Sequence, residues 1–351
     1  MNILALISAF VITSVAYVAL RPLAGRVGLV DIPGGRKHHT LPTPLIGGVG
    51  IYLGTLCISL LSPFVMEQYG MLLGISAFIL VLGVLDDARE VKVSIRMALH
   101  AAAAWVMAVQ AGNQLQSLGD IVFTGPVLLG VLAVPITVFA TVGVINAVNM
   151  SDGLDGLSGG LVLIALVCLS IVALSAGQST MLDFSTILIF SLLAFLALNF
   201  RFIKRKSAII YLGDAGSTLL GFILAWLVIA ATQGESAMIA PVYALWFLGV
   251  PLIDTISLLI KRPLSGRSSF QPGRDHLHHR LLNAGFSKEC AVMILYLASA
   301  AMGGIGLLGY FLGASEGLMF VVFVTLFAVY MLIPDQFTTT VSEAVPATNE
   351  Q

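Results

Sequence analysis

A succession of long apolar runs constrains this chain more than any other feature. Eleven runs occur in its 351 residues, and most are long enough for a helix to cross a hydrocarbon core of about 30 Å. Only 10% of the residues are charged, against roughly 25% in a soluble domain, and the runs lack the apolar–polar alternation of transmembrane β-barrel strands. The sequence therefore predicts an all-α polytopic integral membrane protein. Its transmembrane helices, about 11 in number, are expected at residues 2–20, 45–64, 69–85, 97–111, 126–148, 157–176, 184–202, 207–231, 237–260, 291–312 and 318–333.

Basic residues lie on only one side of these predicted helices. All 17 Lys and Arg residues fall in four segments, 21–44, 86–96, 201–206 and 261–290, whereas the loops predicted on the other side carry acids alone. Short cytoplasmic loops are enriched in Lys and Arg. This pattern predicts that the N-terminus is outside, and that the C-terminus and the four basic segments are cytoplasmic.

The sequence shows no internal repeat and no boundary that would separate a second domain. It predicts one transmembrane domain over residues 1–333, followed by a polar cytoplasmic tail at 334–351 that is expected to be disordered. In one outer loop, residues 113–124 alternate loosely around Gly119-Asp120, which predicts a short β-hairpin.

Composition excludes several other classes of function. The net charge of −1 provides no global field that would recruit nucleic acid. The three cysteines lie in or beside apolar runs without CxxC spacing, so neither a disulfide framework nor a zinc site is predicted. Chemistry must come from the polar residues at the predicted helix ends, where five segments on the predicted cytoplasmic side stand out.

The first segment is a loop rich in proline and glycine that contains Arg36, Lys37 and His38. Cationic side chains in an extended loop could receive a phosphate group. The alternative is an anchor that binds lipid headgroups.

The second segment places Asp86 and Asp87 where the third predicted helix ends. Two adjacent carboxylates at the negative end of a helix dipole are unfavourable unless a cation compensates them. Paired carboxylate oxygens suit Mg²⁺, although a solvated helix end with basic neighbours as counterions is the alternative.

The third segment carries Asn146, Asn149, Asp152 and Asp155 at intervals of three residues. Each Asn or Asp pair would share a face if helical. A calcium-binding EF-hand is rejected because no glutamate follows at the twelfth position of such a loop. Four polar residues within ten exceed what helix capping requires.

The fourth segment contains Tyr211 and Asp214 near the cytoplasmic start of the eighth predicted helix. An isolated acid among apolar residues at membrane depth is costly and is a functional candidate for that reason. Asp254, in the ninth predicted helix, is a candidate on the same grounds, with a buried hydrogen bond to a neighbouring helix as the alternative.

The fifth segment is the longest inner loop and contains Arg267, His276, His278 and His279. Three histidines in four positions beside arginines could bind a metal or an anion. Zinc would want a fourth protein ligand and no cysteine is near, so an anion or phosphate site is favoured.

Taken in order, the five segments resemble the polyprenyl-phosphate N-acetylhexosamine-1-phosphate transferases, and in particular the WecA-like and TagO-like branch of a superfamily that also contains the MraY-like enzymes. The resemblance spans residues 31–285. The motifs that carry it are Arg36-Lys37-His38, Asp86-Asp87, Asn146-x-x-Asn149-x-x-Asp152-Gly-x-Asp155, Gly213-Asp214-x-Gly-Ser217 and His276-Leu-His278-His279.

The resemblance implies a reaction between two substrates. A UDP-N-acetylhexosamine, with N-acetylglucosamine the favoured sugar, and a polyprenyl (undecaprenyl) phosphate would give a polyprenyl diphosphosugar and UMP. The expected location is the cytoplasmic face of a bacterial inner membrane, as the first membrane step of cell-envelope glycan synthesis. The expected cofactor is Mg²⁺, with Mn²⁺ as a possible substitute. A homodimer is left open.

The resemblance also implies a role for each segment. Asp214 is the first choice for the metal. Asp86 and Asp87 would position or deprotonate the acceptor and are further metal candidates. Asn146, Asn149, Asp152 and Asp155 would orient the nucleotide and sugar, and Tyr211 would stack on uracil. Arg267 and the three histidines His276, His278 and His279 would hold the diphosphate and sugar hydroxyls.

Two alternatives compete with this interpretation. The first is transfer of phospho-N-acetylmuramoyl-pentapeptide, whose family pattern has three consecutive histidines, often followed by an acid. Here Leu277 interrupts the histidines and Arg280 follows them. The second is a secondary transporter, which would concentrate ionisable groups near the membrane midplane; only Asp254 approaches that pattern.

Overall fold

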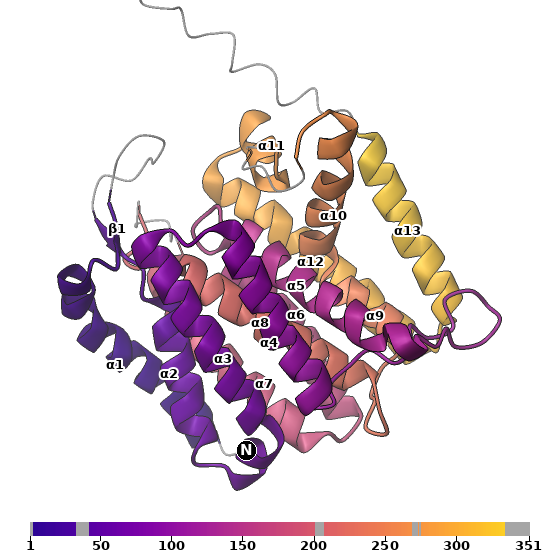
Figure 1. The fold of residues 1–351 in the computed structure, drawn as a ribbon, viewed down its shortest axis with the longest axis horizontal. Coiled ribbons are helices and arrows are strands. Elements are labelled where there is room, and N and C mark those ends of the chain that lie inside the picture. The colour runs from indigo at the N-terminus through magenta and orange to yellow at the C-terminus, as the bar shows by residue number, and fades with distance from the viewer. Residues whose placement is uncertain (1–2, 33–41, 201–206, 269–272, 274, 334–351) are drawn as a thin grey trace, which may run out of the picture.

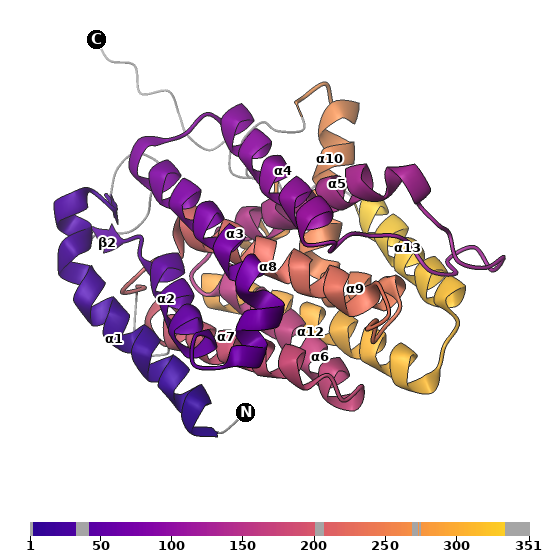
Figure 2. The same cartoon turned by 60° about the horizontal axis from the view of Figure 1, so that its bottom comes forward.

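The structure, a computed structural model, describes residues 3–32, 42–200, 207–268, 273 and 275–333. These residues form a bundle of helices, with α1 at one edge and α13 at the opposite edge (Figures 1 and 2). The helices are α1 (Ile3–Val27), α2 (Gly47–Ser59), α3 (Pro63–Arg89), α4 (Val93–Gln110), a 3-10 turn η1 (Gly130–Leu132), α5 (Ala133–Met150), α6 (Leu157–Ser175), α7 (Ser179–Asn199), α8 (Gly213–Thr232), α9 (Pro241–Phe247), α10 (Gly249–Leu264), α11 (Leu277–Asn283), α12 (Lys288–Leu312) and α13 (Glu316–Leu332). Two short strands, β1 (Val30–Asp31) and β2 (Thr43–Pro44), pair antiparallel in the first inner loop.

The apolar runs of the sequence correspond to these helices. In the described part of the chain, eight helices are long and apolar enough to span a membrane. The α9–α10 pair, bent by 89°, forms a ninth candidate, and the shorter helices α2 and α13 account for the remaining two runs. The all-α polytopic class is confirmed, whereas the number of 11 spans and their orientation stay predictions.

Helix α8 is the centre of the bundle. All but three of its 20 residues are buried, and α2, α3, α5, α6 and α9 pack around it. Glycines permit the closest approaches. A Cβ at Gly83 of α3 would overlap the backbone of Ala215, and one at Gly221 would lie 2.7 Å from the Cα of Ile145 in α5. The start of α8 is therefore held at a fixed depth against α2, α3 and α5.

The helix ends that carry the predicted site residues, called the inner ends here, are joined to one another by backbone hydrogen bonds. Leu45 N donates to Leu29 O, Tyr211 N donates to Pro44 O, and Gly47 N donates to Tyr211 O. The first inner loop is thus joined to the segment that precedes α8. The predicted site residues Arg36, Lys37 and His38, and the predicted tail at 334–351, lie outside the described residues.

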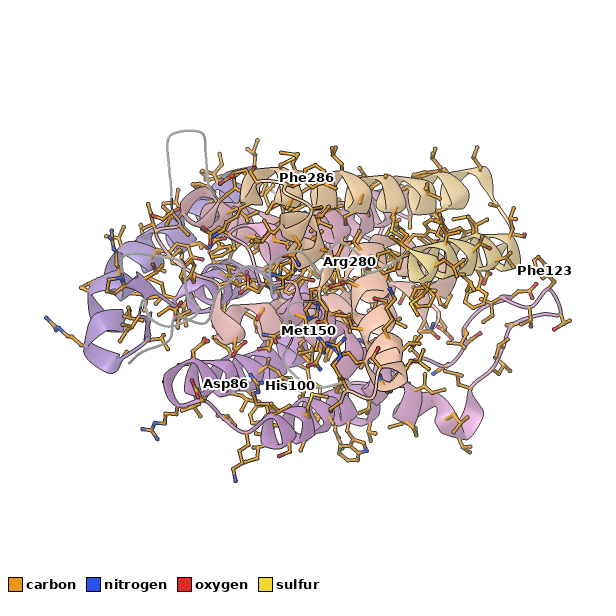
Figure 3. The ribbon with its side chains drawn as sticks, turned by 90° about the horizontal axis from the view of Figure 1, so that it is seen from above. Asp86, His100, Phe123, Met150, Arg280 and Phe286 are labelled. Atoms are coloured by element: carbon orange, nitrogen blue, oxygen red, sulfur yellow. The ribbon has the colours of Figure 1, made fainter. Side chains whose placement is uncertain are left out.

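The opposite ends are joined by a separate set of contacts. Asp120 N donates to Glu316 at 2.8 Å, and the side chain of Gln233 accepts from Gln116 N at 2.9 Å. Phe123 lies in the outermost loop, away from Asp86 and Arg280 of the inner end (Figure 3). The bundle therefore has two distinct polar ends, as the alternation of basic and acidic loops predicts.

The predicted hairpin at 113–124 is wrong in its extent. The loop forms one isolated antiparallel bridge between Ser117 and Leu128, flanked by a bond from Leu118 N to Val127 O. The partner segment lies after residue 124, and no strand is assigned there. Asp120 accepts from Gly125 N at 2.9 Å and so closes a wide turn, while Pro126 has no N–H to extend a ladder.

The two ends should differ in access to a membrane-impermeant thiol reagent. We expect Ser236→Cys to react in intact cells and Ser268→Cys only after permeabilisation, because Lys and Arg mark the cytoplasmic end. Both serines are exposed. The test uses a background in which Cys57, Cys168 and Cys290 are replaced. The reverse pattern of labelling would invert the topology.

Candidate functional site

Asp87 fixes the start of α8. Its two carboxylate oxygens accept hydrogen bonds from the backbone N–H groups of Asp214 at 2.8 Å and Ala215 at 3.1 Å. Gly213 precedes them with a φ of +73°, and a Cβ there would come within 2.5 Å of Asp87 Oδ2. Glycine is needed at this position on both counts. A carboxylate at a helix N-terminus is also favoured by the helix dipole.

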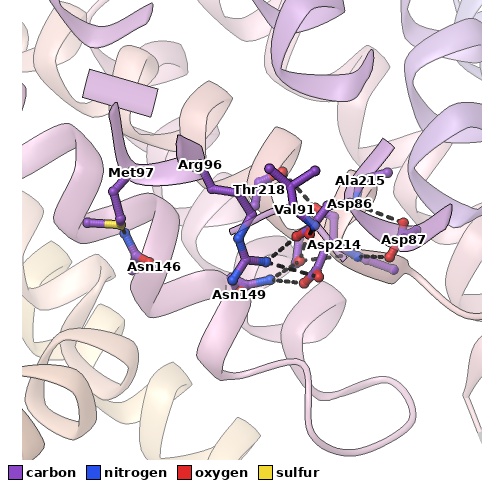
Figure 4. Close-up of polar contacts among 12 residues, drawn as sticks. Asp86, Asp87, Val91, Arg96, Met97, Asn146, Asn149, Asp214, Ala215 and Thr218 are labelled. Atoms are coloured by element: carbon purple, nitrogen blue, oxygen red, sulfur yellow. Dashed lines mark hydrogen bonds and ion pairs between the residues drawn. The ribbon is translucent and has the colours of Figure 1, made fainter. Parts of the chain in front are cut away.

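A guanidinium joins the two acids beside Asp87. Arg96, near the start of α4, donates through Nη1 to Asp86 and lies 3.3 Å from Asp214 Oδ2. The Asp86 side chain is buried and also accepts from Val91 N at 2.8 Å. Figure 4 shows these contacts converging where α3, α4 and α8 meet. We call Asp86, Asp87, Arg96, Asn149 and Asp214 the acidic centre.

Asn149 completes the acidic centre from α5. Its side-chain amide donates to Asp214 Oδ1 at 2.6 Å and to Ser217 Oγ at 2.9 Å, which orients the Asp214 carboxylate. Asn146, one turn earlier, donates instead to Val142 O of its own helix at 2.7 Å and lies against Met97. The structure therefore brings Asn149 into the centre, whereas Asn146 points to α4.

The loop between α5 and α6 borders the acidic centre. Asp152 is exposed in this loop, and crowding by the surrounding protein, together with repulsion by Asp214, Asp87 and Asp155, raises the pKa of its carboxyl. Asp152 therefore lies close to the negative charges of the acidic centre. Asp155 points elsewhere and lines a small cavity with Lys288 at the start of α12.

The histidine segment lies against the same loop. A Cβ at Gly153 would overlap His278 Nε2, so glycine permits this contact. The His276 and His278 rings stack with centroids 5.8 Å apart, and His278 and His279 are 4.2 Å apart. Burial, together with the His279 and His276 rings, lowers the pKa of His278 to about 3, so this ring is neutral near pH 7.

Arg267 is held at the base of the histidine segment. Asp275 binds Arg262 through two hydrogen bonds, of 2.6 and 3.2 Å, and lies 3.4 Å from Arg267. Burial acts to raise the pKa of Asp275, but its bonds to Arg262 and the charges of both arginines outweigh this effect and lower it. The Arg267 side chain is half exposed, so a ligand from solvent can reach it. Its role in substrate binding stays a prediction.

A divalent cation fits the acidic centre chemically. In the described part of the chain, no three acidic, histidine or cysteine side chains are arranged to hold a metal ion. Asp86 and Asp214 nevertheless converge on one cationic nitrogen of Arg96. Hard carboxylate oxygens are the ligands that Mg²⁺ prefers, and Mg²⁺ usually needs only one or two of them beside water and phosphate.

The sequence interpretation missed several residues of the site. The sequence pattern marks Arg96 only as a basic loop residue and indicates no role for Asp275 or its partner Arg262. A basic residue that begins a helix directly after an acidic pair was the available signal for Arg96. No local pattern marks Arg262, because its partner is 13 residues away across a loop. The predicted stacking role of Tyr211 stays a prediction.

An apolar groove lies beside the site. It has a volume of about 450 Å³ and is lined by residues of α1, α6, α7 and α12, among them Phe10, Leu163, Leu196 and Tyr296. The Tyr296 hydroxyl donates to Gly156 O at 2.6 Å, in the loop that carries Asp152 and Asp155. The dimensions and lining suit a lipid chain.

Known proteins match this chain over the region that carries the site. The sequence model of Glycosyl transferase family 4 matches residues 69–232. The undecaprenyl-phosphate α-N-acetylglucosaminyl 1-phosphate transferase of Escherichia coli (strain K12) is 35% identical over 326 residues, which cover 93% of this chain and 89% of the relative. The protein of the same name from Haemophilus influenzae is 36% identical over 315 residues, covering 90% and 88%.

The geometry makes Asn149 the residue that orients Asp214. We expect Asn149→Ala to lower the activity of the purified protein at least ~10-fold, because a hydrogen bond to a charged group contributes roughly 1.5–3 kcal/mol. Asn113→Ala is the matched control: Asn113 Nδ2 donates to Trp226 O of the same helix, α8, at its outer end. If both variants lose activity to a similar extent, Asn149 only stabilises α8 and does not orient Asp214 for the reaction.

Proposed function

The chain belongs to the family of the undecaprenyl-phosphate α-N-acetylglucosaminyl 1-phosphate transferases, and we propose that it transfers N-acetylglucosamine 1-phosphate from a UDP-sugar to undecaprenyl phosphate and releases UMP. Family membership supplies the reaction class, which is transfer of an N-acetylhexosamine 1-phosphate to a polyprenyl phosphate. The UDP donor, the choice of sugar and the cytoplasmic orientation belong to the proposal.

The observation that carries the proposal is the acidic centre beside the histidine segment at one end of the bundle. A phosphoryl transfer between two anionic substrates needs cationic compensation and fixed donors around the transferred group. The acidic centre can hold a cation, and the histidines supply neutral or cationic donors within one turn of α11. A site at the end of the bundle is reached by a water-soluble nucleotide sugar from one side and by a lipid from the membrane.

The reaction joins an oxygen of the lipid phosphate to the β-phosphorus of the donor and breaks the bond between that phosphorus and the bridging oxygen. The electron pair of the broken bond leaves with UMP. A phosphate monoester with a second pKa of ~6 is mostly a dianion at pH 7, so a strong general base is not required. Asp86 and Asp87 then serve mainly to position groups, with Asp87 holding α8.

The neutral His278 and its stacked neighbours would receive the donor diphosphate and the sugar hydroxyls, and Arg267 would reach the same anion from solvent. Asp214 and Asp86 would hold Mg²⁺, or Mn²⁺ in its place, which when bound neutralises charge that develops on the diphosphate. Arg96 contacts both carboxylates and would balance their charge when no metal is present. Asn149 keeps the Asp214 carboxylate turned towards this position.

The structure weakens the case for a secondary transporter. Asp254, the acid that most resembled a midplane ion site, is bound to His276 and Leu277 of the inner segment. The acids of the described chain thus lie towards the two ends of the bundle rather than as an isolated group at the midplane that transport would require. The muramoyl-pentapeptide alternative is disfavoured by Leu277 and Arg280 in the histidine motif.

A donor panel tests the function directly. Purified protein is incubated with undecaprenyl phosphate, Mg²⁺ and radiolabelled UDP-GlcNAc, UDP-GalNAc or UDP-N-acetylmuramoyl-pentapeptide, and the lipid is extracted. We expect labelled lipid and an equal amount of UMP with UDP-GlcNAc. If no donor labels the lipid, the proposed reaction is refuted. If only UDP-N-acetylmuramoyl-pentapeptide labels it, the donor is that nucleotide and not UDP-GlcNAc.

The metal assignment predicts a severe effect at Asp214. Asp214→Asn keeps the volume of the side chain but removes its charge, so we expect UMP release to fall by roughly two orders of magnitude or more, since even an outer-shell partner of a metal can cost 10–100-fold. Glu67→Gln, an exposed acid at the far end of α3, is the control. If Asp214→Asn retains turnover and its half-saturation concentration of Mg²⁺ is unchanged, Asp214 is not a metal ligand and another acid must hold the metal.

A further inference from the structure

Asp254 lies buried in α10, in an apolar environment where an ionised carboxylate is costly unless it is fully hydrogen-bonded. Both of its oxygens are engaged. Oδ2 lies 2.9 Å from His276 Nδ1, and Oδ1 accepts from Leu277 N at 2.8 Å. One acid therefore holds both the ring and the following backbone of the residue that opens the histidine segment.

This arrangement selects one form of the His276 ring. A carboxylate only accepts hydrogen bonds, so Nδ1 must carry a proton. The other nitrogen, Nε2, has no protein partner among the described residues and keeps contact with solvent. His278 differs, because its Nε2 is buried and has no partner in the described part of the chain. In His276, therefore, Asp254 sets which nitrogen carries the proton, and the other nitrogen, Nε2, is left for a ligand.

The far end of the same segment is fixed by aromatic packing. Arg280 donates to the Tyr330 hydroxyl at 3.2 Å and lies 5.4 Å from the centre of that ring, and Lys261 lies 5.8 Å from it. Tyr330 in turn lies within electrostatic range of Asp254. The two cations are therefore held on a ring that neighbours the buried carboxylate, on an element other than the one that carries His276.

We propose that Asp254 is a positioning residue for the transfer reaction: it keeps the proton of His276 on Nδ1 and so presents Nε2 to the diphosphate of the nucleotide-sugar donor. This inference rests on the proposed function for the identity of the ligand. Since the carboxylate takes the Nδ1–H, only Nε2 can face the donor oxygens, and a ring that carries a proton on both nitrogens would make a charge-assisted hydrogen bond to phosphate there. An amide at position 254 would donate to Nδ1 and confine the proton to Nε2, so the ring would be neutral and its hydrogen bond to phosphate would lose its charge assistance.

The first test needs no substrate. Nitrogen NMR of the histidine rings in ¹⁵N-histidine-labelled full-length protein separates the Nδ1–H and Nε2–H forms, and His276→Gln identifies the His276 signals among the six histidines. We expect a protonated Nδ1 in the parent protein and an unprotonated Nδ1 in Asp254→Asn. An unchanged His276 spectrum in Asp254→Asn would overturn the proposal, whether or not the protein transfers sugar phosphate.

The second test asks whether Asp254 acts through His276. We expect Asp254→Asn to reduce kcat/KM for UDP-GlcNAc at least ~10-fold, His276→Gln to reduce it at least as much, and the double variant to be no worse than His276→Gln, since residues that act as a unit are non-additive. Asp254→Glu should recover part of the activity. A merely structural role predicts multiplied losses and no recovery.

Thr255→Val is the matched control for the kinetic test. Thr255 is the next residue of α10 and is buried to a similar degree, 6% exposed against 5% for Asp254, and its hydroxyl has no partner among the described residues. We expect parental kcat/KM in this variant. An inactive parent protein would refute the proposed function and leave the NMR result to decide the inference, whereas an active parent with additive losses would refute the inference alone.

Discussion

The polar site depends on one interaction, the binding of the backbone start of α8 by the Asp87 carboxylate. Helix α8 is the most enclosed helix of the bundle, and its first N–H groups would lie unpaired beside apolar neighbours without an acceptor. Because Asp87 accepts two of them, Asp214 in the first turn is set at a fixed height next to Asp86. Glycine at 83 and at 213 lets the two helices approach closely enough for these bonds to form.

The charges of the centre follow from that placement. Asp86 and Asp214 are 128 residues apart in the sequence. Bringing both acids into a partly buried position would be costly without a cation. Arg96 supplies it in the structure, and Asn149 adds a neutral donor that turns the Asp214 carboxylate. A site built this way holds a positive charge between two acids.

The histidine segment is positioned by a separate set of bonds. Asp254 holds its first residues, Arg262 and Asp275 close its base, and Arg280 packs on Tyr330 at its end. These contacts come from α10 and α13, whereas the acidic centre comes from α3, α4, α5 and α8. The two halves meet at Gly153, whose lack of a side chain admits His278. The geometry of the candidate site therefore depends on how two groups of helices pack rather than on a single motif.

The sequence by itself determined the class of the protein, because apolar runs of about 20 residues leave the chain no fold other than membrane helices. All 11 predicted runs correspond to helices, and the acidic pair, Asn149, Asp214 and the histidines were recognisable because polar residues are costly beside such runs and so stand out. The β-hairpin was misplaced because Asp120 and Pro126 set a wide turn that local alternation does not reveal.

Only the tertiary structure decided which of these residues meet. Asn146 and Asn149 are equivalent by spacing, yet only Asn149 reaches Asp214. Residues three apart on a helix point in somewhat different directions, and the packing of α5 decides which of them faces α8. Arg96 and Asp254 contact partners 118 and 22 residues away in the sequence. Such pairings arise from helix packing at close range, and the packing is fixed by side-chain shape across the whole bundle, which no local pattern records.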